Sequence, residues 1–314
     1  MDRKPVSVKS YANIAIVKYW GKADAERMIP STSSISLTLE NMYTETKLSF
    51  LPEDATGDVM YIDDELQGEK ETTKASKVLD LFRTNPNQHV KIETWNNMPT
   101  AAGLSSSSSG LSALVKAANE LFQVGKTQSE LAQIAKFASG SSSRSFFGPL
   151  AAWDKDSGEV YQVETDLKLA MIMLVLTDQK KPVSSRDGMK LCTETSTSFP
   201  EWIKQSEQDY EDMLGYLKSN DFQAVGELTE ANALRMHQTT STANPPFSYL
   251  TDASYQAMDK VKALRASGEQ CYFTMDAGPN VKVLCLEEDL DRLADHFRKD
   301  YQVIVSRTKE LPDA

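Results

Sequence analysis

The sequence predicts an α+β protein built of two parts. At 314 residues the chain has the length of about two domains. Its hydrophobic fraction of 40% is that of a protein with packed cores. Segments with strand alternation and segments with helical spacing follow one another without the strict alternation of β-α units. We place the two parts at residues 1–178 and 179–314.

The first part is predicted to be rich in strands. Apolar and polar residues alternate clearly over 34–39, Ser-Ile-Ser-Leu-Thr-Leu. The turn residues 156–158, Asp-Ser-Gly, separate two short apolar segments and predict a hairpin. Thr127 and Glu130 have the spacing of a capping box, so a helix is predicted after Thr127. The strands expected here are 6–8, 35–39, 44–50, 59–62, 90–94, 151–153 and 160–163, and the helices are 73–83, one after the serine run 105–109, and one from about residue 128.

The second part is predicted to be more helical. The apolar segment 170–176 predicts a buried strand, and amphipathic spacing follows it over much of the remaining chain. The helices expected here are 186–195, 201–217, 222–236, 255–266 and 290–299, and further strands are expected at 272–275, 281–286 and 303–306.

Composition and charge exclude several classes of protein. The net charge of −11 and the pI near 4.9 disfavour nucleic acid and anionic membranes as partners. The longest apolar run, 169–176, is too short to span a bilayer, and the first residues lack the apolar segment of a signal peptide. Three widely spaced cysteines and three scattered histidines indicate neither a disulfide framework nor a zinc site. We therefore expect a cytoplasmic protein.

Segment 99–110, Pro-Thr-Ala-Ala-Gly-Leu-Ser-Ser-Ser-Ser-Ser-Gly, predicts a phosphate-binding loop. It lies between a predicted strand and an apolar helix, so its backbone N–H groups and hydroxyls would meet at the positive end of that helix. A flexible linker or a simple helix cap is the alternative interpretation of such serines. The flanking strand and helix argue against a linker. We therefore expect the chain to bind a phosphorylated small molecule.

Two further segments carry positive charge. Lys18 and Lys22 flank residues 19–21, Tyr-Trp-Gly, where the glycine lets the backbone approach a ligand that the two ammonium groups neutralise. The alternative is an amphipathic edge strand with solvated lysines. Arg144 ends segment 139–144, Ser-Gly-Ser-Ser-Ser-Arg, and its guanidinium suits a carboxylate or a phosphate. Together the two segments predict an anion site.

Asp276 is the candidate acid of the chain. It follows a predicted strand and opens the turn 276–279, Asp-Ala-Gly-Pro. An ordinary turn aspartate is the alternative interpretation. A carboxylate that faces an anion site would instead orient a hydroxyl or act as a general base. Segment 179–189 adds Ser184 and Ser185 ahead of a helix, which makes it a further candidate anion contact. Surface charge is the alternative interpretation of its Lys180, Lys181 and Arg186.

Taken in order, these segments resemble the diphosphomevalonate decarboxylase family, also called the mevalonate diphosphate decarboxylases, of the GHMP kinase superfamily. Segment 99–110 resembles the phosphate loop of the superfamily. The resemblance covers nearly the whole chain. The segments that are similar to blocks of the decarboxylases themselves are 12–22, 139–144, 183–189 and 274–282.

The resemblance implies a fold and a reaction. The N-terminal half would have the ribosomal protein S5 domain 2-like fold and the C-terminal half the GHMP fold, with the active site in the cleft between them. The enzyme would be a carboxy-lyase that converts (R)-5-diphosphomevalonate and ATP into isopentenyl diphosphate, ADP, phosphate and CO2, in the mevalonate pathway of isoprenoid biosynthesis. ATP and Mg2+ would be the cofactors, and the protein would commonly be a homodimer.

The resemblance also implies roles for single residues. Asp276 would act on the tertiary 3-hydroxyl, Arg144 would bind the carboxylate, and Lys181 would support the phosphate during transfer. The substrate would be held by Lys18, Tyr19, Lys22, Ser139, Ser141, Arg144 and Ser185. The nucleotide would be held by Gly103, Ser105, Ser106, Ser107 and Ser108, with Ser106 at Mg2+, and by Lys70 or Lys74.

The chain departs from the family pattern at three positions. Ser105 and Ser108 stand where the family usually has alanine, and Pro149 stands where it usually has glycine. Two other functions fit the superfamily. One is a small-molecule kinase, of the mevalonate 3-kinase or phosphomevalonate kinase type, and the other is a GHMP-fold binding protein without catalysis. Arg144 and Asp276 favour the decarboxylase over both.

Overall fold

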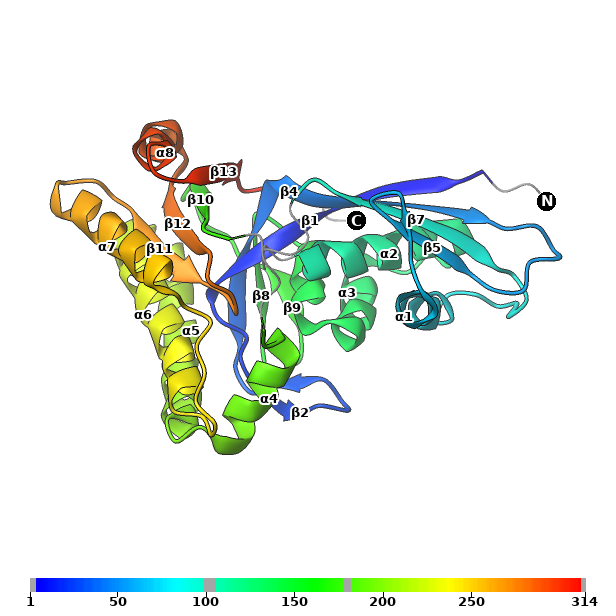
Figure 1. Ribbon diagram of the computed structural model, residues 1–314, viewed down its shortest axis with the longest axis horizontal. Coiled ribbons are helices and arrows are strands. Elements are labelled where there is room, and N and C mark those ends of the chain that lie inside the picture. The colour runs from blue at the N-terminus through cyan, green and yellow to red at the C-terminus, as the bar shows by residue number, and fades with distance from the viewer. Residues whose placement is uncertain (1–3, 99–105, 178–181, 312–314) are drawn as a thin grey trace.

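The computed structural model describes residues 4–98, 106–177 and 182–311, without the side chains of Ser106 and Ser107. Figure 1 shows two parts that lie next to each other. One has a long sheet with helices below it, and the other has a smaller sheet covered by helices. The predicted α+β class in two parts is confirmed.

The N-terminal part is built on a sheet of seven strands. They are β1 Val6–Val17, β4 Ser34–Phe50, β5 Val59–Ile62, β6 Glu65–Leu66, β7 Val90–Asn96, β8 Leu150–Trp153 and β9 Val160–Gln162, while β2 Lys22–Asp24 and β3 Ile29–Pro30 form a separate pair. The strand order is β6-β5-β7-β4-β8-β9, with β1 also paired to β4. The pair β5 and β7 runs parallel, and the other pairs of this sheet are antiparallel.

Strand β4 is one continuous strand where the sequence predicts two. Glu40 and Asn41 interrupt the apolar alternation and are exposed, so in sequence they resemble a turn. In the structure β4 runs through them with a register shift against β1. Strand β1 is also longer than the predicted 6–8, and it ends directly before Lys18. This extension brings Lys18 to the end of a strand.

Helices cover one face of this sheet (Figure 1). They are α1 Glu69–Leu79, α2 Ser106–Phe122, α3 Gln128–Ala138 and the short 3₁₀ helix η1 Gly140–Phe146. Their apolar sides share one core with the sheet, in which Leu114 and Ala118 of α2 lie with Ile92 of β7. The predicted capping box is confirmed, because Thr127 Oγ1 accepts from Glu130 N and the Glu130 carboxylate accepts from Thr127 N.

The C-terminal part has a sheet of four antiparallel strands. Its elements are β10 Leu169–Val175, α4 Ser185–Thr195, α5 Phe199–Lys218, α6 Phe222–Ser241, α7 Asp252–Ala266, β11 Tyr272–Met275, β12 Val281–Leu286, η2 Glu287–Asp289, α8 Leu290–Arg298 and β13 Gln302–Arg307. The strand order is β11-β12-β10-β13. Since β10 belongs to this sheet, sheet membership divides the chain before Leu169 rather than at residue 178.

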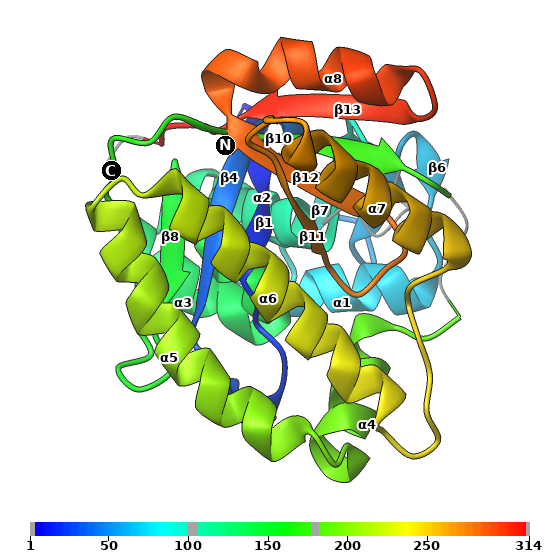
Figure 2. The same ribbon diagram turned by 90° about the vertical axis from the view of Figure 1, so that its left-hand side faces the viewer.

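The two parts share a core. Buried side chains of β1 and β4, such as Ile14 and Leu37, belong to one apolar cluster with Met171 of β10 and Met213 of α5. Figure 2 shows α6 crossing in front of β1 and β4, with α5 alongside it. The C-terminal end of β1 therefore contacts α6. Side chains from both halves of the chain meet there.

The remaining predicted elements are present with shifted ends. Helix α1 begins at Glu69 instead of residue 73. The predicted hairpin forms between β8 and β9, with Trp153 opposite Val160. The three cysteines are buried free thiols. Across the described residues, no helix has both the length and the apolar character needed to cross a membrane.

Candidate active site

Asp276 lies at the turn between β11 and β12 with a lysine at each carboxylate oxygen. The two strands pair as far as Met275 opposite Val281, so the turn begins at Asp276. Lys18 Nζ donates to Asp276 Oδ1 and Lys282 Nζ donates to Oδ2, each at 2.9 Å. The lysine side chains are 2% and 1% exposed, whereas that of Asp276 is 24% exposed. The carboxylate is thus held between two buried cations and still reaches the surface.

The charge states follow from these contacts. Burial by itself would raise the pKa of the Asp276 carboxyl, but the charges and hydrogen bonds of Lys18 and Lys282 outweigh burial and hold that pKa well below its usual range. Burial lowers the pKa of Lys18 to about 8, against the attraction of Asp276. At neutral pH the site therefore holds an ionised Asp276 and a protonated Lys18.

The end of β1 fixes the position of Lys18. Its backbone N donates to Asn232 Oδ1 at 2.8 Å, and Thr32 Oγ1 donates to its carbonyl at 3.1 Å. Its ammonium also donates to the Ala15 carbonyl at 2.6 Å. The alternative of a solvated lysine is wrong for this residue, because its side chain is buried.

Lys282 is a site residue that the sequence interpretation missed. It lies in β12 opposite Thr274, inside the apolar run 281–286, Val-Lys-Val-Leu-Cys-Leu. A lysine inside a buried strand requires a partner for its charge, and the preceding turn supplies Asp276. A single lysine in an apolar strand directly after an aspartate turn is the sequence signal that identifies it.

Arg144 is buried in the N-terminal part with neutral partners. Its Nε donates to Ser36 Oγ at 3.0 Å, its Nη1 to Ser34 Oγ at 2.5 Å, and its Nη2 to Asn13 Oδ1 at 3.4 Å. Burial lowers the pKa of Arg144 to about 10, despite the attraction of the Asp276 carboxylate. Because its described hydrogen-bond partners are all uncharged, the guanidinium keeps its charge available for an external anion.

Tyr19 packs on the segment that carries Arg144. Its ring centroid lies 5.1 Å from that of Trp153. A Cβ atom added to Gly140 would come within 2.9 Å of both rings, so the close approach requires glycine at this position. Burial raises the pKa of Tyr19 to about 12, so its hydroxyl stays protonated at neutral pH and can donate to a ligand.

A second positive cluster lies beside Tyr19. Lys22 in β2 is half-buried, and burial together with the charge of Arg186 lowers its pKa. Arg186 is exposed in the first turn of α4, and its charge also acts on Tyr19. Figure 1 shows α4 and β2 as neighbours. The sequence interpretation left Arg186 open as surface charge, and the structure brings it next to Lys22.

The described serines of the predicted site lie on three elements. Ser139 and Ser141 lie together at the start of η1, with their Oγ atoms 3.2 Å apart. Ser185 is half-buried and begins α4. Ser108 is buried in the first turn of α2. Ser139 caps η1 and Ser141 lies within it, so both belong to the segment that carries Arg144, whereas Ser108 belongs to the helix that follows the serine run.

Other predicted residues fall outside the described part of the chain. They are Gly103, Ser105 and Lys181, and the side chains of Ser106 and Ser107. The roles predicted for them stay predictions. Helix α2 begins at Ser106 and has no acidic residue in its first turn, which suits an anion at its positive end.

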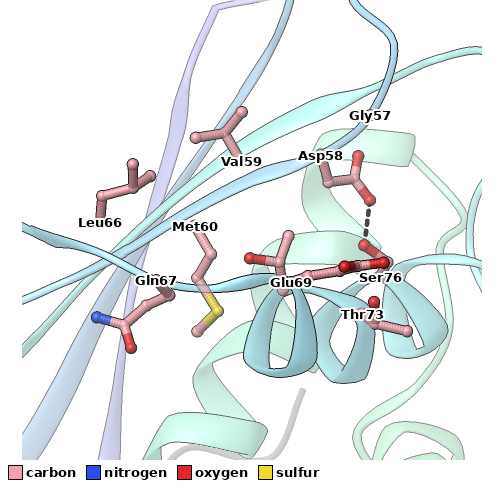
Figure 3. A pocket seen from close by; sticks show the side chains of 10 residues that line it. Gly57, Asp58, Val59, Met60, Leu66, Gln67, Glu69, Thr73 and Ser76 are labelled. Atoms are coloured by element: carbon pink, nitrogen blue, oxygen red, sulfur yellow. Dashed lines mark hydrogen bonds between the residues drawn. The ribbon is translucent and has the colours of Figure 1, made fainter.

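Lys70 lies apart from Asp276, exposed in the first turn of α1. Lys74 follows one turn later and is ion-paired within the same helix. A cavity of about 460 Å³ lies between α1 and β5 (Figure 3), and the charged residues along its described wall are Asp58 and Glu69. Asp58 is paired with Arg83, and the lining of this cavity contributes no cation, so the cavity does not suit a polyphosphate.

Within the described ranges, no cluster of three or more His, Cys, Asp or Glu side chains is placed to hold a metal ion. Mg2+ that is bound through phosphates needs only one or two protein ligands, because it keeps several waters. The serine run of the sequence supplies hydroxyl oxygens and Asp276 supplies a carboxylate, and both are oxygen donors of the kind that Mg2+ prefers. The donor set therefore fits Mg2+ bound together with a nucleotide.

These residues define the class of protein. An ionised aspartate between two lysines, a buried arginine with neutral partners and a helix N-terminus that suits phosphate come from both halves of a two-part α+β fold. Such groups supply the positioning and charge neutralisation that phosphoryl transfer to a small acidic molecule requires.

Comparison with known protein families gives the particular family. Residues 10–163 match the diphosphomevalonate decarboxylase-like N-terminal domain, and residues 171–312 match the mevalonate 5-diphosphate decarboxylase C-terminal domain. The chain belongs to the diphosphomevalonate decarboxylase family. The resemblance found in the sequence is confirmed.

Individual relatives agree with this result. A mevalonate pyrophosphate decarboxylase from Streptococcus pyogenes is 67% identical with a TM-score of 0.97, over 100% of this chain and 99% of that chain. The structure of MDDEF in complex with MVAPP, AMPPCP and magnesium is 40% identical with a TM-score of 0.90, over 98% of each chain. A diphosphomevalonate decarboxylase from Saccharomyces cerevisiae is 33% identical, over 91% of this chain and 79% of its own. The expected GHMP-type fold is confirmed.

Proposed function

We propose that this chain catalyses the ATP-dependent decarboxylation of (R)-5-diphosphomevalonate to isopentenyl diphosphate, with release of ADP, phosphate and CO2, in the mevalonate route to isoprenoids. One observation carries the proposal: Asp276 is an ionised carboxylate between Lys18 and Lys282, and the buried Arg144 is near enough to interact with its charge. The reaction requires a group that orients a hydroxyl and a cation that binds a carboxylate, and these residues supply both.

Phosphorylation of the 3-hydroxyl is the first step. Asp276 accepts a hydrogen bond from this hydroxyl and orients its oxygen toward the γ-phosphate of ATP. The hydroxyl proton leaves along that hydrogen bond as the O–P bond forms and the bond to ADP breaks. Because the transition state of phosphoryl transfer is loose, the oxygen needs orientation more than a strong base. A carboxylate with a strongly lowered pKa suits that role.

Loss of phosphate and CO2 is the second step. The C3–O bond breaks and phosphate leaves with the bonding electrons. The electrons of the bond between C2 and the carboxylate carbon form the new C=C bond, and CO2 departs. Arg144 binds the carboxylate, and Ser34 and Ser36 hold the guanidinium in place. Since CO2 is neutral, the ion pair is lost as the bond breaks, so Arg144 contributes orientation.

The diphosphate end of the substrate needs its own donors. We assign Tyr19, Lys22 and Arg186 to this end, because their charges and donors lie together beside η1 and α4. The hydroxyl donors assigned to it are Ser139, Ser141 and Ser185.

We assign the ATP phosphates to the start of α2. The nucleotide-binding set is Gly103, Ser105, Ser106, Ser107 and Ser108, with either Lys70 or Lys74. Lys181 is assigned to the phosphate during its transfer. Ser106 is assigned to Mg2+, which neutralises phosphate charge when it is bound. The related MDDEF was solved in complex with AMPPCP and magnesium, which supports the use of a nucleotide together with Mg2+.

We also propose a cytoplasmic location, because three buried thiols suit a reducing compartment. The homodimer stays a prediction from the family resemblance.

A product assay tests the proposed reaction. The chain is incubated with ATP, Mg2+ and diphosphomevalonate, and CO2, phosphate and ADP are measured. We expect CO2 and inorganic phosphate in equal amounts. Formation of ADP without CO2 would indicate a kinase that stops at the phosphorylated product. No turnover at all would indicate a binding protein.

A further inference from the structure

Asp209 of α5 is a buried acid that the proposed reaction does not use. Its Oδ2 accepts from Asn232 Nδ2 at 2.8 Å and from Arg235 Nη2. Its Oδ1 accepts from Gln205 Nε2 at 3.1 Å. Asp209 and Asn232 are both fully buried, whereas the Arg235 side chain is 29% exposed. All three partners donate N–H groups, so the carboxylate acts as an acceptor at both oxygens.

The contact with Asp209 sets which way the Asn232 amide points. An amide can turn its oxygen or its nitrogen toward a neighbour, but a carboxylate takes a hydrogen bond only from the nitrogen. With Nδ2 directed at Asp209, Oδ1 faces the backbone N of Lys18, which donates to it at 2.8 Å. A backbone N–H only donates, so both neighbours require the same orientation of the amide. Asn232 therefore presents a fixed acceptor to Lys18.

Lys18 lies directly beyond the paired part of β1. The last pair with β4 is Val17 opposite Ile35, and the next N–H uses Asn232 of the C-terminal part as its acceptor. A buried N–H that lost its acceptor would destabilise this arrangement. The ammonium of the same residue lies 2.9 Å from Asp276 Oδ1, so a shift of the backbone here changes the contact with the acid.

The chain after Lys18 has separate anchors. Trp20 Nε1 donates to Thr239 Oγ1, and the Trp20 carbonyl accepts from Trp202 Nε1, each at 2.9 Å. These bonds hold the segment that leads to the proposed diphosphate site, and they do not involve Asn232. Loss of the Asn232 amide is therefore expected to release Lys18 and to leave the diphosphate site in place.

We propose that Asn232 is a positioning residue for the reaction, which holds the end of β1 so that the Lys18 ammonium meets Asp276, and that Asp209 fixes the orientation of its amide. The inference rests on the proposed function and adds to it two buried residues that act through Lys18. Their effect falls on the phosphoryl-transfer step, because the contact with Lys18 helps to orient the Asp276 carboxylate.

Asn232→Leu removes the acceptor with little change in volume. We expect kcat to fall by about 10- to 100-fold, because a small displacement of a reacting group has effects of this size. The Kd of diphosphomevalonate should stay nearly the same, since the diphosphate site is anchored separately. Release of ADP and CO2 gives kcat, and calorimetry gives Kd. Thr229→Val is the matched control, because Thr229 is buried one turn earlier on α6 and its hydroxyl donates to the Val225 carbonyl of the same helix.

The pH dependence of kcat/KM is a second measurement. Lys18 helps to hold the pKa of Asp276 down, so its displacement lets that pKa rise, and kcat/KM of Asn232→Leu should begin to fall at a higher pH on acidification. The charged and titratable groups that interact with Asp276 are Lys18, Lys282, Arg144 and His237. All four are present in the variant, so the shift reports the position of Lys18. A loss of stability alone would not move the profile.

An exchange of the two side chains tests the orientation of the amide with almost no change in shape. In Asn232→Asp two carboxylates face each other across the 2.8 Å contact, and their repulsion should lower kcat. Adding Asp209→Asn restores one amide and one carboxylate across this contact. Arg235 can pair with either position, because its Nη2 and Asn232 Nδ2 already share one oxygen of Asp209. We expect the double variant to recover most of kcat, and this pair carries the test if thermal melting shows that Asn232→Leu does not fold.

Three results would overturn the inference. One is an unchanged kcat and an unchanged pH profile in folded Asn232→Leu. Another is an equal fall of kcat in Asn232→Leu and Thr229→Val, which would indicate a general loosening of α6. The third is a double variant that is no more active than Asn232→Asp. Failure of the proposed function is a separate result, because the unaltered chain would then form ADP without CO2, and kcat for ADP release would still test Asn232.

Discussion

Lys18 and Asp276 are 258 residues apart in the chain, yet Lys18 Nζ and Asp276 Oδ1 lie 2.9 Å apart. Lys18 comes from the end of β1 in the N-terminal sheet, and Asp276 from the turn after β11 in the C-terminal sheet. Lys282 completes the group from β12. Because both lysines are buried, loss of the carboxylate would leave two unpaired cations side by side. The group therefore depends on the packing of the two parts against each other.

Asp276→Asn removes the negative charge and nearly keeps the shape. We expect kcat to fall by about 10²–10⁴-fold, because an amide cannot take up the hydroxyl proton. Binding of AMPPCP should survive, since the nucleotide is assigned to α2. The measurements are CO2 release and calorimetry. Asp291→Asn, which changes an exposed acid on α8, is the control. Near-normal turnover of Asp276→Asn would refute the role given to this residue.

Lys282→Met shifts the acid side of the pH–rate profile. In the unaltered chain Lys18 and Lys282 outweigh burial and hold the pKa of Asp276 well below its usual range, so its carboxylate is ionised at ordinary pH. Without Lys282 only one lysine opposes burial, and the pKa of Asp276 rises.

Since the ionised form is the active one, kcat/KM of Lys282→Met should begin to fall at a higher pH when the solution is acidified. The pH dependence of kcat/KM measures this shift. Lys262→Met, which changes an exposed lysine on α7, should leave the profile in place. A profile of Lys282→Met that coincides with that of the unaltered chain would contradict the assignment.

Arg144→Lys keeps a positive charge and loses the fork of donors. We expect kcat/KM to fall by about 10- to 100-fold, the loss of one or two hydrogen bonds to a charged group. The bonds to Ser34 and Ser36 are also lost, so the remaining ammonium is less well oriented.

A substrate analogue without the carboxylate tests whether Arg144 binds the substrate through that carboxylate. Its affinity should be nearly the same for the unaltered chain and for Arg144→Lys, because the contact in question is missing from both complexes. An equal loss of affinity for the analogue and for diphosphomevalonate would show that Arg144 does not bind the carboxylate.

Gly140→Ala places a methyl group where Tyr19 and Trp153 leave no room. The added Cβ would lie 2.9 Å from both rings. We expect a loss of about 1–3 kcal/mol in the free energy of unfolding and weaker binding of diphosphomevalonate, because Tyr19 must move. Chemical denaturation and calorimetry measure the two effects. Gly215→Ala on α5 meets no atom within 4 Å and should not destabilise the chain. Equal stability of both variants would disprove the packing argument.

The order of elements and the identity of the site segments were predictable from the sequence. The hairpin at Trp153 and Val160 and the capping box at Thr127 follow local rules of turn and helix chemistry, and both formed as predicted. Strand β4 did not, because exposed Glu40 and Asn41 resemble a turn when only local polarity is considered. Pairing on both sides of the strand outweighs that local preference.

The candidate site was predictable only in part. Lys18, Arg144 and Asp276 stand in segments whose residue types already indicate anion chemistry. Lys282 escaped notice because a lysine in a strand usually faces solvent, and only its burial identifies it as a partner of Asp276.

The sequence by itself determined the family, the kinds of charged groups and the helix that follows the serine run. These depend on local order along the chain, where turn chemistry, periodicity and residue type act over a few positions. Only the tertiary structure decided that two buried lysines bind Asp276 and that Arg144 has neutral partners. Burial and pairing arise when distant segments pack together, and they set the pKa of each group through the neighbours that packing supplies.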